Sequence, residues 1–284
     1  MKIAIVNHCT QEMLLGPDGR PAPLVTDALL QLFTEVCNKY ADIVAEEHDI
    51  FSVLRLAEDG MLLPGEFELG LWDSTDQAGA AGYHDTDPQG RPYAKAFRNE
   101  ADDFGASEWS LTAIATHELA EIMRDPFACW WIDRGTYEEA LELCDRVEGY
   151  SFGLQFGGAE VQCADFLTAA ALDPKAPTGP WDYMNKLSSQ TGISPDGYAI
   201  VRTASYESNR GAFDKPDVRS GKSFRRRNWK TKTAIGRTGK RLGMQAGIER
   251  RCPVCQTPLA NPKHMVAPCS VPVTPKPTTE PNTK

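Results

Sequence analysis

The sequence predicts an α+β domain with a mixed sheet, and three observations lead to that class. Short apolar segments of strand length are separated by polar turns over much of the N-terminal part of the chain. Two longer segments, 24–44 and 107–124, carry apolar residues at helical spacing. The apolar content falls sharply after about residue 208, so the domain is expected to span residues 1–205.

The individual elements follow from local patterns in chain order. The helix near residue 107 is expected to begin at Ser107 or Ser110 and to stop at Asp125-Pro126. Residues 77–92 are rich in Gly, Asp and Pro and predict a loop, and 138–147 predicts a second short helix. Strands are expected at 3–6, 51–56, 67–71, 161–167 and 198–201, with an edge strand at 93–97.

Charge is distributed unevenly along the chain. The net charge is −9, yet residues 206–251 contain 14 Lys and Arg against 4 Asp and Glu. The sequence therefore predicts an acidic body followed by a basic arm. No apolar run approaches the roughly 20 residues needed to cross a membrane, and the apolar run at the N-terminus is too short for a signal peptide. These observations predict a cytoplasmic protein with no membrane partner.

The strongest chemical signal is His117-Glu118-Leu119-Ala120-Glu121, on the predicted 107–124 helix. His117 and Glu121 are four residues apart, so both can bind one ion from the same helix face. Glu118 is rotated away and can act as the general base on water held by that ion. The pattern resembles the His-Glu-x-x-His motif of zinc metallopeptidases, with Glu121 in place of the second histidine. A surface helix that carries these residues by chance is the alternative.

A second group of acids lies downstream, within Glu142-Leu143-Cys144-Asp145. In zincins that use a glutamate ligand, a later helix supplies the third ligand as Glu, and an Asp three or four residues on orients a histidine. Glu142 matches the ligand, and Asp145 matches the orienting acid. A solvated helix face is the alternative for both.

Several segments together resemble an uncharacterised family encoded by phages and bacteria. The resemblance covers about residues 80–203 and implies that its motifs belong to one site, in a virion component or an early protein made in the host cytoplasm. Within it, His84 has three alternative roles: a further metal ligand, a hydrogen-bond donor on the substrate side, or a residue of a turn. Asp165 either supports the site or is a polar residue at the end of a strand. Asp125 is a further candidate supporting acid. The segments are Gly82-Tyr83-His84-Asp85, His117 to Glu121 with Asp125-Pro126, Glu142 to Asp145, Asp165-Phe166, and Ser194 to Tyr198.

The basic arm interleaves charge with aromatic residues, most clearly over Lys222–Lys232. This pattern is typical of segments that follow phosphates and stack on bases, so residues 210–251 are expected to contact nucleic acid. An acidic protein surface is an equally good partner.

Residues 252–270 predict a small cysteine module. Cys252-Pro253-Val254-Cys255 resembles the first half of a zinc ribbon, and His264 and Cys269 can complete a second, structural zinc site. An unstructured tail that bears thiols is the alternative. The last residues, 271–284, are rich in Pro and Thr and predict disorder.

Two functions follow from these features. The first is a zincin-like metal-dependent hydrolase, most simply a peptidase acting on a protein or peptide. Its zinc, or another divalent ion, is bound by His117, Glu121 and Glu142, with Glu118 as the base and His84, Asp125, Asp145 or Asp165 in support. The second is a catalytically silent virion or partner-binding protein with the same fold.

Overall fold

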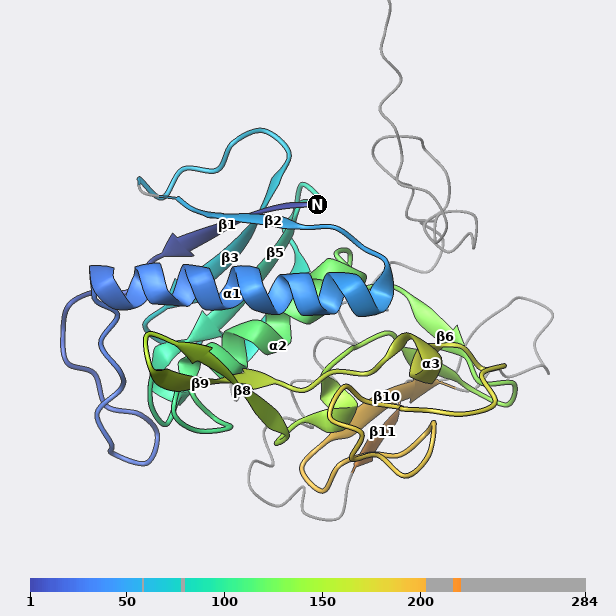
Figure 1. The fold of residues 1–284 in the computed structure, drawn as a ribbon. Helices are drawn as coiled ribbons and strands as arrows, with labels where there is room; N and C mark the ends of the chain where they lie inside the picture. Colours follow the sequence, from blue (N-terminus) through green and yellow to red (C-terminus); the bar gives the residue numbers. More distant parts are fainter. Residues whose placement is uncertain (58, 78–79, 203–216, 221–284) are drawn as a thin grey trace, which may run out of the picture. The chain divides into compact units, whose positions relative to one another are not determined.

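The computed structural model describes residues 1–57, 59–77, 80–202 and 217–220, all within the first of two units into which the chain divides, Met1–Gly243. Most of the predicted basic arm, all of the cysteine module at 252–270 with Cys252, Cys255, His264 and Cys269, and the 271–284 tail lie outside the described residues. The described part is α+β with a mixed main sheet, which confirms the predicted class (Figure 1).

The main sheet has five strands in the order β2-β1-β3-β5-β4. Strand β1 runs parallel to β2 and to the central strand β3, and β3 runs parallel to β5. Only the edge strand β4 is antiparallel, paired with β5. The strands are β1 Lys2–Asn7, β2 Val53–Leu56, β3 Glu66–Trp72, β4 Gly82–Thr86 and β5 Pro92–Phe97.

Two helices pack together over the sheet (Figure 1). Helix α1, Asp27–His48, begins after Thr26, whose side chain accepts a hydrogen bond from the Leu29 N–H. Helix α2, Leu111–Arg124, begins after Ser110, which accepts from the Ala113 N–H. Ser110 is therefore the cap, as one of the two sequence alternatives predicted. The apolar faces of both helices enter one core with the buried side of the sheet.

The remaining elements form a four-stranded antiparallel sheet, β11-β10-β7-β6, and a hairpin of β8 and β9. Strand β11 comes from the range predicted as basic arm and pairs with β10. The elements are β6 Trp131–Asp133, β7 Glu138–Ala140, β8 Ser151–Phe156, β9 Ala159–Ala164, α3 Ala169–Leu172, β10 Tyr198–Arg202, β11 Asp217–Ser220, and the short 3-10 helices Arg98–Glu100 and Asp145–Val147. No helix among the described residues is both long and apolar enough to cross a membrane.

Two expectations about local structure are wrong. The expected loop at 77–92 contains strand β4, so β5 lies inside the sheet and β4 forms the edge. The chain reverses at Asp87-Pro88-Gln89-Gly90, where the Asp87 N–H bonds to the Arg91 carbonyl and Gly90 has φ +80°. A turn of this composition joins two strands of a hairpin, which makes the Gly and Asp content a turn signal within a paired segment.

The expected helix at 138–147 is also wrong. Residues Glu138–Ala140 form strand β7, which pairs with β6 across a turn at Gly135, where φ is +82°. Only Asp145–Val147 is helical, as a single 3-10 turn. The hairpin supplies backbone partners that a short isolated helix lacks.

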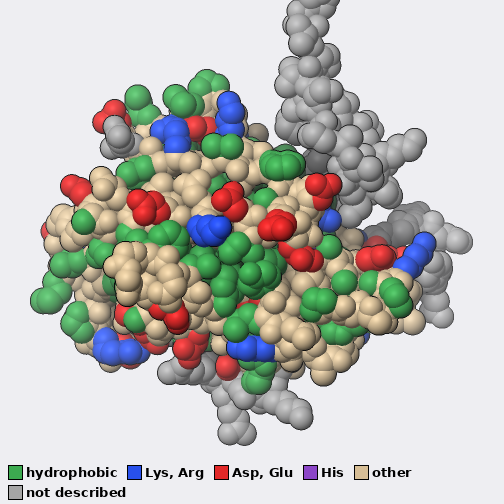
Figure 2. Space-filling view, in the orientation of Figure 1, with side chains coloured by type: hydrophobic (Ala, Val, Ile, Leu, Met, Phe, Trp, Pro, Cys, Tyr) green, Lys and Arg blue, Asp and Glu red, His purple; other side chains and the backbone are tan. Residues whose placement is uncertain are grey.

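Figure 2 shows acidic side chains spread over the face that α1 covers. Exposed acids of α1 on this face of the sheet include Glu35, Asp42 and Glu46. This distribution agrees with the acidic body that the sequence predicted.

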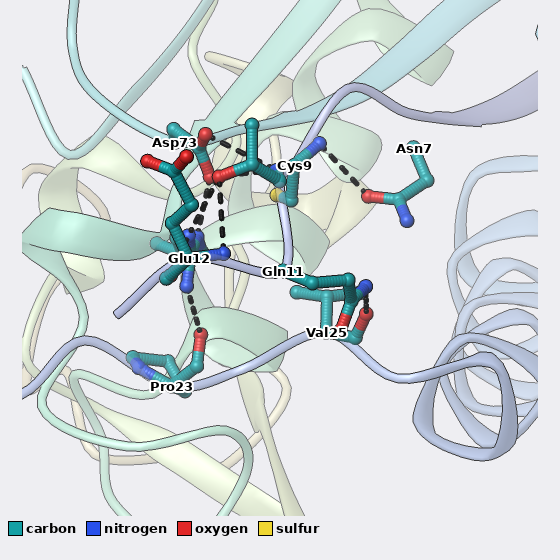
Figure 3. Close-up of polar contacts among 9 residues, drawn as sticks. Asn7, Cys9, Gln11, Glu12, Pro23, Val25 and Asp73 are labelled. Atoms are coloured by element: carbon teal, nitrogen blue, oxygen red, sulfur yellow. Dashed lines mark hydrogen bonds and ion pairs between the residues drawn. The ribbon is translucent and has the colours of Figure 1, made fainter. Parts of the chain in front are cut away.

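A buried arginine joins the carboxyl ends of the parallel strands to the segment that follows β1. Arg98 follows β5 and is 0% exposed. Its Nε donates to Asp73 Oδ1 at 2.6 Å, and its Nη atoms donate to the carbonyls of Glu12 at 2.8 Å and Pro23 at 3.3 Å (Figure 3). Asp73 also accepts from the Thr10 N–H. These bonds fix the long connection between β1 and α1 to the carboxyl ends of the parallel strands.

Replacing this arginine tests the connection. Because Arg98→Ala leaves Asp73 and two carbonyls without their buried donor, we expect a loss of about 3 kcal/mol in the free energy of unfolding. Arg91→Ala removes an exposed partner of Asp87 in the β4–β5 turn and is the matched control, with an expected loss of at most about 1 kcal/mol. Urea unfolding of both variants measures the difference. Equal losses would contradict the role given to Arg98.

Candidate metal centre

Helix α2 holds its polar residues inside the protein. All of its residues except His117 and Arg124 are buried, including Glu118 and Glu121. Thr116 fixes the helix to β9, because its hydroxyl accepts a hydrogen bond from the Ala164 N–H at 2.9 Å. The predicted pattern therefore lies on a buried helix, and the surface-helix alternative does not apply.

Strand β4 carries His84 against this helix. The strand can approach closely because residue 82 is glycine: a Cβ there would lie 2.8 Å from Glu118 Cγ and 2.9 Å from the Lys95 carbonyl oxygen. His84 follows two residues later, on the same face of the strand, and is 1% exposed. The edge strand and the helix thus bring His84 to the acids of α2.

Three carboxylates surround the His84 ring. Its Nδ1 lies 3.2 Å from Glu121 Oε2 and 3.7 Å from Glu118 Oε2. Its Nε2 lies 3.8 Å from Glu142 Oε2. Glu142 therefore approaches the far nitrogen of His84, whereas Glu118 and Glu121 share the near one.

His117 lies against two further carboxylate oxygens. Its Nε2 is 3.2 Å from Glu121 Oε1 and 3.2 Å from Asp145 Oδ1. Asp145 reaches this position from the 3-10 turn after β7. The Cys144 N–H also bonds to Glu121 Oε1 at 3.4 Å, which fixes this turn against α2.

The acids change the protonation of both histidines. Burial by itself lowers the pKa of His84, but Glu142, Glu118 and Glu121 outweigh it and raise that pKa to about 10. Burial likewise lowers the pKa of His117, and Glu121, Asp145 and Glu118 raise it to about 10. Burial raises the pKa of Glu121, yet the two histidines hold it well below the usual range of a glutamate. Without a metal ion, both rings are imidazolium at neutral pH.

The buried group can hold a metal ion. His84, Glu118 and Glu121 each offer a ligand atom, and these atoms lie within 4.8 Å of one another, as do those of His117, Glu121 and Asp145. Neighbouring ligands of a tetrahedral ion with bonds of about 2.0 Å are about 3.3 Å apart. The distances of 3.2 Å from Glu121 to each histidine match that separation. Imidazole and carboxylate together suit several first-row divalent ions.

A cleft opens beside the group. Its volume is about 600 Å³ when the open mouth is included. His117 and Glu118 line it, together with Gly82, Asp165 and Tyr150. A molecule in this cleft would therefore contact His117 and Glu118 of α2.

Asp125 and Asp165, the other two acids that the sequence suggested as supports for the site, lie apart from each other. Asp125 ends α2, where its Oδ2 accepts from the Trp130 N–H at 2.8 Å, and it belongs to neither ligand group. Asp165 lines the cleft, and its Oδ1 accepts from the Phe166 and Met184 N–H groups. Burial, followed by the neighbouring Asp182, raises the pKa of Asp165 to about 8. It is thus largely protonated at neutral pH.

The sequence left His84 open as a further ligand, a substrate-side donor or a turn residue, because a loop was expected there. In the structure His84 contacts more carboxylates of the group than His117 does. The available signal was the Asp87–Gly90 turn, which pairs Gly82–Thr86 with the following strand and turns His84 inward. Glu142 reaches the group from the segment after β7 and Asp145 from the 3-10 turn, and the expected second helix is not required.

Comparisons of the chain with models of protein families, with curated proteins and with solved structures found no match.

Proposed function

We propose that this protein is a metal-dependent hydrolase, and specifically a zincin-like metallopeptidase. The observation that carries the proposal is the buried His84–Glu118–Glu121 group, of which Glu118 lines the cleft. Buried acids require positive charge beside them, and a metal ion can supply it in place of the imidazolium rings. An ion there, zinc being the first candidate, lowers the pKa of a water molecule that it holds.

The residues of the chain have distinct roles in this proposal. His84 Nδ1 and Glu121 Oε2 hold the ion from the buried side. Glu118 is the member of the group that lines the cleft. Its carboxylate can therefore contact the ion and also face the cleft, through which water and substrate enter. Glu118 accepts the proton from the attacking water. Asp165, whose pKa is raised to about 8, lines the same cleft and donates a proton to the leaving group.

The first prediction concerns pH and metal. The pKa of each histidine is raised from 6.5 to about 10 by folding, so their stabilising contribution to the metal-free protein is complete below about pH 6.5 and is lost as the pH rises through about 10. An ion requires neutral imidazoles and competes with these protons. We therefore expect the rise in melting temperature caused by zinc or manganese to grow between about pH 6 and pH 8.

Chelator-treated protein, melted with and without added metal across this range, checks the prediction. The variant Glu121→Gln, which removes the carboxylate charge between both histidines, should show little metal-induced rise at any pH. A rise in the wild-type protein that is independent of pH, or is larger at low pH, would contradict it.

The second prediction concerns Glu118. Glu118→Gln removes the proton acceptor but keeps an oxygen that can contact the ion, so metal content and melting temperature should change little. Hydrolysis of casein or cell-wall peptides should fall by at least about a hundredfold. Glu35→Gln, an exposed change on α1, is the matched control and should retain full activity.

Equal turnover in wild type and Glu118→Gln would refute the role of Glu118. No turnover in either protein, with metal bound, would favour the catalytically silent virion or partner-binding protein. The replacement of the second histidine of the zincin motif by Glu121 is the feature that fits that alternative.

A further inference from the structure

The Glu121 carboxylate lies between two histidines and presents a different oxygen to each. Oε2 is 3.2 Å from His84 Nδ1, and Oε1 is 3.2 Å from His117 Nε2. A carboxylate in this position is the usual bridge of a two-metal site, where the ions are about 3.5–4 Å apart. The ligand atoms accordingly form two groups that share Glu121.

The second group has the composition and spacing of an ion site in its own right. His117 Nε2 is 3.2 Å from both Glu121 Oε1 and Asp145 Oδ1. Both separations match the roughly 3.3 Å expected between ligands of a tetrahedral ion. Glu121 and Asp145 are buried, while the His117 side chain is 14% exposed and lines the cleft. The three protein ligands are thus on the buried side, and a further ligand can enter from the cleft.

Charge within the cluster gives a second, independent argument. Four buried carboxylates, those of Glu118, Glu121, Glu142 and Asp145, surround two imidazoles. With neutral imidazoles, two divalent ions supply four positive charges, which equals the charge of four ionised carboxylates. Charged groups inside a protein require such compensating charges nearby. The acid content therefore fits two ions better than one.

We propose that the centre is dinuclear, with Glu121 bridging one ion held by His84 and Glu118 and a second ion held by His117 and Asp145. This inference rests on the metal binding in the proposed function and extends it. Two ions at this spacing could together hold the attacking water and the carbonyl oxygen of a peptide substrate. His117 and Glu118, which both line the cleft, would then each bind a different ion of the pair.

Manganese gives the sharpest test on the full chain, because Mn²⁺ prefers oxygen and imidazole ligands over the thiolates of Cys252 and Cys255. We expect about two Mn²⁺ per chain after desalting, with the electron paramagnetic resonance spectrum of an exchange-coupled pair. His117→Ala and Asp145→Ala each remove a ligand of the second ion, so each should lower the content to about one ion and give the spectrum of an isolated Mn²⁺. His8→Ala, an exposed histidine paired with Glu68, is the control and should change neither.

The outcomes distinguish this inference from the proposed function. One Mn²⁺ per chain in wild type, isolated in its spectrum and unaffected by Asp145→Ala, would overturn the dinuclear centre and leave a single-ion hydrolase intact. If manganese is not retained, zinc content is measured in the double variant Cys252→Ser and Cys255→Ser. Two equivalents there support the inference and one overturns it. Absence of both metals would overturn the metal centre altogether.

Discussion

The burial of Glu121 is the constraint on which the rest of the site depends. Its carboxylate is fully buried, and it is kept ionised by a histidine on each side and by the Cys144 N–H. Each of these partners comes from a different element, so β4, α2 and the turn after β7 must all meet at one point. The mixed sheet, with an antiparallel strand at its edge, makes this meeting possible.

Close approach of the backbone is the second requirement. Gly82 allows β4 to lie against Glu118, and any side chain there would displace the acid or the strand. Thr116 fixes the opposite side of α2 to β9. The helix is thus held between an edge strand that supplies a histidine and a hairpin that contributes to the cleft. Rigid placement of this kind keeps ligand atoms at the spacing that an ion requires.

Protonation links the stability of the fold to the chemistry of the site. Without an ion, His84 and His117 carry the positive charge that the acids need, and both pKa values are raised to about 10. With an ion, the metal takes over that task and the rings become neutral ligands. Asp165, with its pKa raised to about 8, can hold a proton at the cleft wall, whereas the pKa of Glu121 is held well below its usual range. The cluster can therefore exchange the protons of its histidines for metal.

The sequence by itself determined the fold class and the two main helices, because helix caps and apolar periodicity are local properties, and it selected the segment from His117 to Glu121 as a candidate metal site. It also selected Glu142 and Asp145 as acids near the site, although it expected them on a helix. Only the tertiary structure decided that His84 belongs to the centre and that Asp125 does not. The reason is that β4 reaches α2 through pairing with β5, a contact between segments that no local pattern specifies. The bridging position of Glu121 likewise depends on three elements meeting, which spacing along one helix cannot reveal.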